Sequence, residues 1–213
     1  MIGAISGIGG GVIIKPVMDS LGFFSVATIS FLSGMTVLCM SGYCLIIRDK
    51  NTQIKKSISI YLAIGAVAGG VIGRWLFSFM DSIVQQKWLG LIQAVILLAI
   101  NLLIFLYLKN KHRIRHYNVT APVACIMLGC MLGIISSFLG IGGGPINIAL
   151  LALFYSLRQK ECALNSLFII FCSQLASLIS GITTGAIPTF QWQILSVMCA
   201  GGITGAFIGR KLS

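Results

Sequence analysis

Residues 121–157 constrain the fold more than any other part of the chain, because these 37 consecutive residues include no charged side chain. As one straight helix they would extend about 55 Å at 1.5 Å per residue, whereas the hydrocarbon core of a bilayer is about 30 Å thick. The sequence GIGGG at 140–144 lies just past the middle of the segment, and consecutive glycines are poor helix formers. We therefore predict that the chain breaks or folds back at this glycine run.

Five further apolar runs have about the length of one membrane span, and short polar loops connect them. These runs are 25–47, 57–79, 88–108, 162–182 and the shorter 194–209. Charged residues make up only 9% of the chain and hydrophobic residues 57%, whereas soluble domains carry about 25% charged residues. This composition excludes a soluble fold. The net charge of +11 lies mainly in the loops, which is typical of a membrane protein and argues against nucleic-acid binding.

Two motifs occur twice, and they divide the chain into related halves. GIGGG occurs at 7–11 and at 140–144, and a G-x3-G-x3-G-R segment occurs at 65–74 and 201–210. We predict an all-α polytopic membrane protein of two repeats, each a glycine-broken re-entrant hairpin followed by about three spanning helices. Residues 1–108 form the first membrane repeat, 109–118 a basic cytosolic connector, and 119–213 the second membrane repeat.

The loop charges predict that the two repeats are inverted relative to each other. If each glycine-broken segment is a hairpin, 12 of the 15 lysine and arginine residues lie on the cytosolic side; if each crosses once, only 8 do. Cytosolic loops carry an excess of these residues, so the hairpins are favoured. Three spans per half then give the halves opposite orientations. Inverted repeats with matched glycine-interrupted segments are an architecture of secondary transporters.

The glycine runs have three interpretations. A dinucleotide loop is disfavoured, because the third glycine of G-x-G-x-x-G is replaced by Val12 in one copy and by Pro145 in the other. Close helix packing is the second, but it better fits Gly65, Gly69 and Gly73, whose spacing puts them on one helix face. In lipid, non-helical backbone occurs where it is buried in protein or lines a wet cavity. We favour a cavity-lining turn whose free N–H groups attract an anion.

The motif G-x-G-G-G-x4-P resembles the TauE/SafE sulfite exporter family of bacterial membrane permeases. It consists of Gly7, Gly9, Gly10, Gly11 and Pro16, and the second glycine run and the paired G-x3-G-x3-G-R segments add to the likeness. The resemblance spans essentially the whole chain. It implies a multi-pass protein of the bacterial inner (plasma) membrane that transports small sulfur-containing anions such as sulfite, thiosulfate or organosulfonates. Against two full repeats, we expect the first to lack its N-terminal part and the second its final helix.

Polar residues in and after the hairpins are the candidate substrate ligands, because hydroxyl and amide groups donate hydrogen bonds without the full charge that would trap an anion. The alternative for the hydroxyls is a bond to a carbonyl of their own helix. The predicted substrate-binding residues are Gly9, Gly10, Gly11, Gly142, Gly143, Gly144, Asn147, Ser30, Asn165, Ser166 and Gln174.

Three basic residues within or beside the apolar segments are Lys15, Arg74 and Arg210. Lys15 could attract an anion, and Arg74 and Arg210, at equivalent places on opposite faces, could form paired gates, but we expect these long side chains to anchor at the membrane interface. No G-x-S-x-G motif or intramembrane carboxylate pair supports a membrane enzyme, so we expect no catalytic residue, cofactor or metal ion. A noncatalytic membrane subunit, or an inactive fragment of such a transporter, is the alternative to a permease. The expected partners are a small anion and the lipid bilayer, and a homo-oligomer is left open.

The hairpin arrangement predicts which loops face the cytosol. Single cysteines at 48–56, 109–118 and 158–161, in a cysteine-free background, should be protected from a membrane-impermeant thiol reagent in intact cells. Cysteines at 81–87 and 183–193 should react. Labelling of 158–161 from outside would contradict both the hairpins and the inverted repeat.

Overall fold

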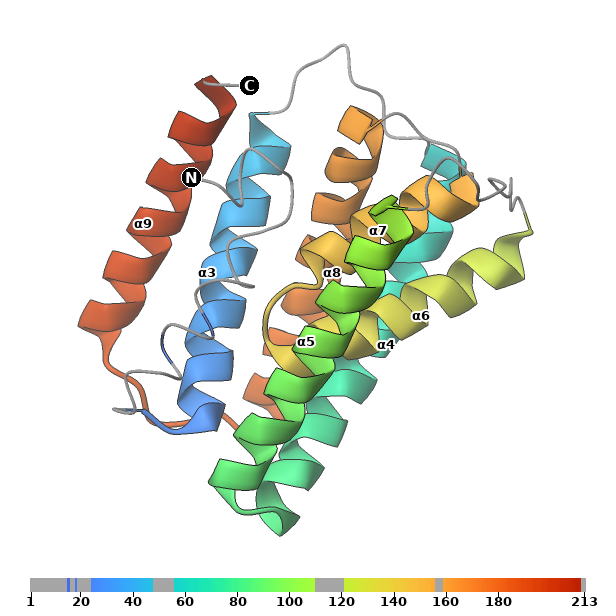
Figure 1. Ribbon diagram of the computed structural model, residues 1–213. Coiled ribbons are helices and arrows are strands. Elements are labelled where there is room, and N and C mark those ends of the chain that lie inside the picture. The colour runs from blue at the N-terminus through green and yellow to red at the C-terminus, as the bar shows by residue number, and fades with distance from the viewer. Residues whose placement is uncertain are drawn as a thin grey trace.

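The protein is helical throughout the part of the chain that the computed structural model describes, which is residues 15, 18, 24–47, 56–109, 121–155 and 159–211. The helices are α3 (Val26–Ile46), α4 (Lys56–Ile83), α5 (Gln86–Lys109), α6 (Pro122–Leu139), α7 (Gly144–Tyr155), α8 (Gln159–Thr183) and α9 (Trp192–Lys211) (Figure 1). Six of them are long and apolar enough to cross a membrane, whereas α7 has only 12 residues. The predicted all-α polytopic fold class is confirmed.

The observed helix bounds agree with the expected spans except at the connection placed at 81–87. Helix α4 continues to Ile83 and α5 starts at Gln86, so only two residues separate them. The first glycine run, with Gly9, Gly10 and Gly11, lies outside the described residues. The first hairpin and the inverted relation of the halves therefore remain predictions.

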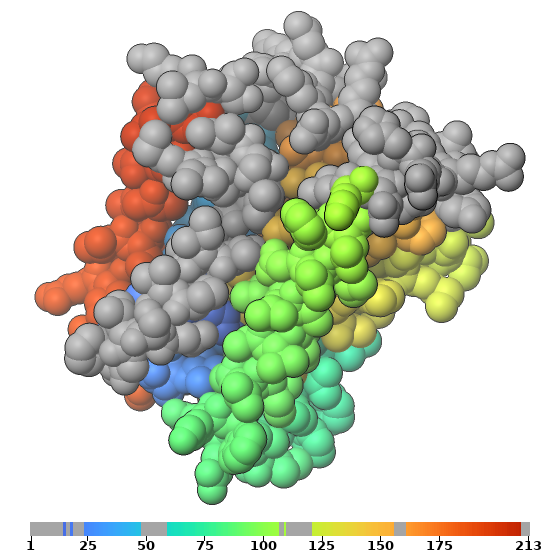
Figure 2. Space-filling model, viewed as in Figure 1, coloured from blue at the N-terminus to red at the C-terminus, as the bar shows by residue number. Residues whose placement is uncertain are grey.

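Helix α5 lies on the surface of the bundle, where Figure 2 shows it crossing one face of the molecule. Little of it is buried, although its exposed side chains include Leu98, Leu103 and Phe105. Exposure of large apolar side chains to water is unfavourable, whereas their contact with lipid tails is favourable. The surface therefore has the character of a membrane protein, as the composition predicts.

Helices α4 and α6 form the most extensive helix pair in the bundle, and glycines bring their backbones together. Gly65, Gly69 and Gly73 of α4 face the α6 backbone, and a Cβ added at Gly73 would lie 2.6 Å from the carbonyl oxygen of Ile134. Gly133 of α6 meets α4 in the same way. Small residues permit such close approach between membrane helices, so the predicted packing role of this glycine ladder is confirmed.

The long uncharged segment breaks at the glycine run, as predicted. Helix α6 ends at Leu139, and positive φ angles of 64°, 80° and 61° follow at Gly140, Gly142 and Gly143, a region that L side chains with a Cβ rarely adopt. The hydroxyl of Tyr155, the last residue of α7, donates to the sulfur of Cys125 near the start of α6, at 3.0 Å. The second half of the segment thus folds back along the first.

Two hydrogen bonds near helix ends show which helix ends lie on the same side of the bundle. The hydroxyl of Ser59 donates to the amide oxygen of Asn165, which places the beginnings of α4 and α8 on one side. The hydroxyl of Thr28 donates to the carbonyl oxygen of Thr189 at 3.2 Å, which places the beginning of α3 beside the loop between α8 and α9. Helices α4 and α8 therefore run in the same direction, and their connections to the next helices lie at the same end.

The glycine ladder allows a matched test of packing. Gly65→Ala places a methyl group inside the α6 backbone at Ile126, so the two helices must separate, at a cost of about 1–3 kcal/mol. Gly201→Ala, at the corresponding position of α9, meets nothing within 4 Å. We expect a lower melting temperature and yield for Gly65→Ala only, measured by size-exclusion chromatography after heating in detergent. Equal behaviour of the two variants would contradict the packing role.

Candidate functional site

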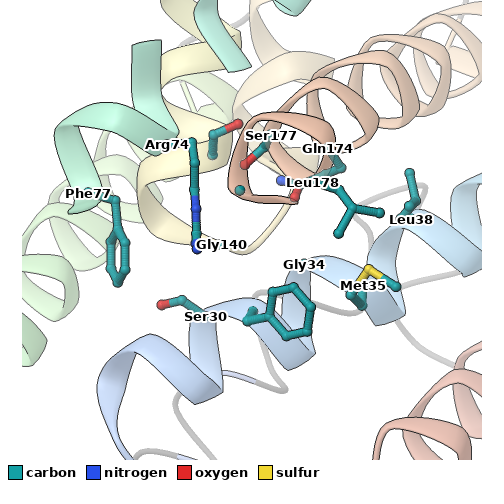
Figure 3. A pocket seen from close by; sticks show the side chains of 13 residues that line it. Ser30, Gly34, Met35, Leu38, Arg74, Phe77, Gly140, Gln174, Ser177 and Leu178 are labelled. Carbon is teal, nitrogen blue, oxygen red and sulfur yellow. The ribbon is translucent and has the colours of Figure 1, made fainter. Parts of the chain in front are cut away.

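A small polar pocket lies where α3, α4 and α8 meet the turn that ends α6 (Figure 3). Its volume of about 30 Å³ accommodates roughly two water molecules. The side facing α3 is largely apolar, whereas α4, α6 and α8 contribute polar groups. The lining residues are Ser30, Phe31, Gly34, Met35, Leu38, Arg74, Phe77, Ser137, Gly140, Gln174, Ser177, Leu178 and Gly181.

Arg74 supplies the positive charge of this pocket. It directly follows the last glycine of the ladder and is only 8% exposed. Its guanidinium carbon lies 5.7 Å from the ring centre of Phe77, and its Nη2 donates to the carbonyl oxygen of Ala186. Asp81, two turns further along α4, attracts Arg74 electrostatically but does not line the pocket. The expectation that Arg74 anchors at the interface is wrong, because α8 and its following loop cover the side chain.

Two hydrogen-bond donors that line the pocket have no acceptor. The Nε of Arg74 and the hydroxyl of Ser137 are both buried, and neither has a hydrogen-bond partner among the described residues. Leaving a buried donor unpaired costs about 1–3 kcal/mol, and more for a charged group. In native structures such groups usually indicate a water, an ion or a functional role. The two donors make the pocket chemically suited to an acceptor with negative charge.

Lys15 is buried beside the pocket, with 2% of its surface exposed. Its ammonium donates to the hydroxyl oxygen of Ser30 at 2.8 Å, to the carbonyl oxygen of Leu139 at 2.8 Å and to the amide oxygen of Gln93. The expectation that Lys15 reaches the membrane interface is wrong. The reason is local: α6 ends inside the protein, and the negative end of its dipole attracts a cation.

Side chains from four different segments donate hydrogen bonds to the carbonyl groups at the end of α6. The last carbonyls of a helix have no partner within it, and in lipid each must be satisfied by the protein. The donors and the carbonyls they reach are Gln174 to Ser136 (3.3 Å), Gln93 to Phe138 (2.7 Å), Lys15 to Leu139 (2.8 Å) and Ser33 to Gly140. The glycine turn is therefore tied to α3, α5, α8 and Lys15.

The loop between α8 and α9 covers one side of the pocket. Ala186 accepts the bond from Arg74, and Thr189 accepts the bond from Thr28 of α3. The ring of Phe190 lies 5.0 Å from that of Phe31, centre to centre, and Phe31 lines the pocket. A group that enters from this side must displace the loop.

The structure brings two of the predicted ligands to the pocket and places two elsewhere. Ser30 and Gln174 line it. Asn165 does not: its amide oxygen accepts from Ser59 of α4, and its amide nitrogen donates to the carbonyl oxygen of Glu161 at 2.8 Å, so it connects helices. The hydroxyl of Ser166 lies 3.5 Å from the carbonyl oxygen of Gly144, at the beginning of α7.

The second glycine run and Asn147 are buried next to the pocket without lining it. Gly142 packs toward Val37 and Ile170, and Gly143 lies near Ser136 and Asn147. Asn147 is fully buried, and neither its amide oxygen nor its amide nitrogen has a hydrogen-bond partner. This unsatisfied amide marks a second polar position, at the first turn of α7.

Sequence reasoning did not select Arg74, Ser137 or Ser177 as ligands. Arg74 carried a signal, because a charged residue inside a spanning segment is a functional candidate by default. The two serines carried none that sets them apart from the other hydroxyl residues of the spans.

Comparison with known proteins agrees with the membrane architecture. The chain is similar to the probable membrane transporter protein YunE of Bacillus subtilis (strain 168), with 24% identity over 237 residues, covering 99% of this chain and 85% of that protein. It is also similar to the probable membrane transporter protein YdhB of the same organism, with 25% identity over 187 residues, covering 85% of this chain and 72% of that protein. No solved structure matches significantly. The family model "Sulfite exporter TauE/SafE" matches residues 1–213, and the chain therefore belongs to the TauE/SafE family of membrane transporters.

Proposed function

We propose that this transporter is a permease for small sulfur-containing oxyanions, such as sulfite, thiosulfate or an organosulfonate, in the inner membrane of a bacterium. The proposal rests mainly on one observation. Two buried hydrogen-bond donors in the same pocket, Arg74 Nε and Ser137 Oγ, have no acceptor among the described residues. A guanidinium offers planar, paired donors that match the oxygens of an oxyanion. Among the described residues that line the pocket, none is acidic, and the acidic residue that acts electrostatically on Arg74, Asp81, lies outside the lining.

The remaining polar groups of the pocket complete the proposed binding site. The hydroxyls of Ser30 and Ser177 and the amide of Gln174 add neutral donors beside the charged one. Neutral donors favour binding that is strong enough for entry and weak enough for release. The cavity of about 30 Å³ must widen before an oxyanion fits, and release of the loop between α8 and α9 is the proposed movement.

The glycine runs form the second part of the proposal. Gly142, Gly143, Gly144 and Asn147 lie at the N-terminal end of α7, where the helix dipole favours an anion. We assign them, with Ser166 and the matching Gly9, Gly10 and Gly11, to the passage through which the anion leaves the pocket. The bond from Lys15 to Leu139 supports this, because it places Lys15, which is close in sequence to the first glycine run, beside the turn that contains the second.

Replacement of Arg74 tests the charged ligand. Arg74→Gln removes a charge-assisted hydrogen bond worth about 1.5–3 kcal/mol, so sulfite affinity should fall roughly 10- to 100-fold. The measurement is sulfite binding to the purified protein in nanodiscs, followed by uptake of radiolabelled sulfite into proteoliposomes. If purified wild-type protein, with no other protein in the liposomes, takes up sulfite, the chain is a permease. If it does not, the alternative of a noncatalytic subunit or inactive fragment is favoured.

Thr28→Val is the matched control for Arg74→Gln. It removes another hydrogen bond to the same loop and leaves the pocket charge in place. We expect sulfite affinity within a factor of about three of wild type. An equal loss in both variants would mean that Arg74 acts by holding the loop, and the anion site would lie elsewhere.

Gly143→Ala tests the passage. The native φ of 61° strains an alanine by about 1–2 kcal/mol, and the new methyl group would lie 3.3 Å from Ser136. We expect at least a tenfold loss of sulfite uptake, which requires only about 1.4 kcal/mol. Gly201→Ala on α9, away from the glycine run and from the loop between α8 and α9, meets nothing within 4 Å and should retain uptake. Similar losses in both variants would contradict the assignment of the glycine run to the passage.

A further inference from the structure

Among the described residues, three oxygen atoms from three separate elements accept hydrogen bonds from the ammonium group of Lys15. They are the hydroxyl oxygen of Ser30 on α3, the amide oxygen of Gln93 on α5 and the carbonyl oxygen of Leu139 at the end of α6. All of these residues are buried. Hydroxyl, amide and backbone carbonyl oxygens are the ligands that proteins offer to hard cations, and the carbonyl ends of broken membrane helices coordinate Na⁺ in other transporters.

One of the three partners of the ammonium, Gln93, is itself fixed in the orientation that a cation requires. The amide nitrogen of Gln93 donates to the carbonyl oxygen of Phe138 at 2.7 Å, which turns the amide oxygen toward Lys15. A flipped amide would place its NH₂ group against the ammonium and its oxygen against a carbonyl, so both contacts disfavour it. The amide oxygen of Gln93 is therefore held by the protein and does not merely adapt to the lysine.

Ser30 connects this cation to the pocket. A hydroxyl has one donor and two acceptor positions. The hydroxyl oxygen of Ser30 accepts the hydrogen bond from Lys15, so the hydroxyl proton of Ser30 can be donated to another group. Ser30 also lines the pocket that contains Arg74, so that group can be an anion in the pocket. A positive charge behind the hydroxyl strengthens its donation to an anion.

We propose that Ser30, Gln93 and Leu139 form a monovalent-cation site, and that the ammonium of Lys15 occupies it as a tethered cation. The lysine neutralises the buried negative end of α6 and orients Ser30 toward the anion. Anion binding in the adjacent pocket then needs no alkali ion from solution. The cation site itself can be tested without any anion, and only its link to the pocket rests on the proposed function.

Lys15→Ala empties the site and leaves its oxygens in place. In nanodiscs without oxyanion, wild type should melt at the same temperature in choline, sodium, potassium, ammonium and methylammonium chloride. The variant should melt several degrees lower in choline and recover by about 3 °C or more, saturably, in ammonium or methylammonium. A melting temperature of the variant that is insensitive to the cation would overturn the proposal, as would a variant that cannot be purified even in ammonium buffer.

Lys15→Met is the matched control, because it removes the charge but fills the space with a chain of similar length. It should be destabilised and should not respond to ammonium. Recovery of both variants would mean that the salt acts elsewhere on the protein.

Sulfite binding to the same samples separates the two proposals. With Lys15→Ala, affinity should fall at least tenfold in choline and return in ammonium. If ammonium restores the melting temperature but sulfite binds to no sample, wild type included, the cation site stands and the substrate assignment fails. If wild type binds sulfite and the variant binds it equally well in choline, the link between the cation site and the pocket is wrong.

Discussion

The carbonyl end of α6, buried within the membrane-spanning bundle, is the constraint on which the rest of the structure depends. A helix that stops inside lipid leaves peptide groups that water cannot solvate, and each costs several kcal/mol unless the protein supplies a partner. Gln174, Gln93, Lys15 and Ser33 supply those partners from α8, α5, the chain before α3, and α3. The glycine turn thereby becomes the point at which most of the fold is joined, which explains why the polar side chains of an otherwise apolar protein gather there.

The candidate site is a consequence of the same arrangement. Elements drawn together around the turn leave a small pocket between them. Among the described residues, the buried side-chain atoms without a hydrogen-bond partner are Arg74 Nε, Asp81 Oδ1, Ser137 Oγ and the amide oxygen and nitrogen of Asn147. A transporter needs buried polar groups that keep free hydrogen-bonding capacity, because a fully paired network has no donor left for a substrate. The loop between α8 and α9 has a related property. Arg74 bonds to its Ala186 carbonyl, so the anion binding that we propose would draw the guanidinium inward and weaken the contact between Arg74 and this loop.

The sequence predicted two polar residues of this pocket, Ser30 and Gln174, but not the roles of Arg74 in it and Lys15 beside it. Ser30 and Gln174 were selected because hydroxyl and amide groups donate hydrogen bonds to an oxyanion without the full charge that would trap it. Lys15 and Arg74 were assigned to the interface, since a long basic side chain near a span end usually reaches the headgroups. Both side chains are buried instead, because of residues distant in sequence. The end of α6 lies beside Lys15, and α8 with its following loop lies over Arg74. Asn165 shows the opposite error, because its partner Ser59 comes from a helix about a hundred residues away.

The sequence by itself determined that the chain is a helical membrane protein, where its spans lie, that its longest apolar segment breaks at GIGGG, and that Gly65, Gly69 and Gly73 pack a helix. These features follow from local quantities: segment length against bilayer thickness, helix propensity and residue spacing on one helix face. Only the tertiary structure decided which polar groups are paired and which remain available. Pairing is a relation between residues distant in sequence, set by which helix ends meet, and no local pattern records it. The four side chains that satisfy the end of α6, and the two unpaired donors beside it, became visible only when the helices were placed against one another.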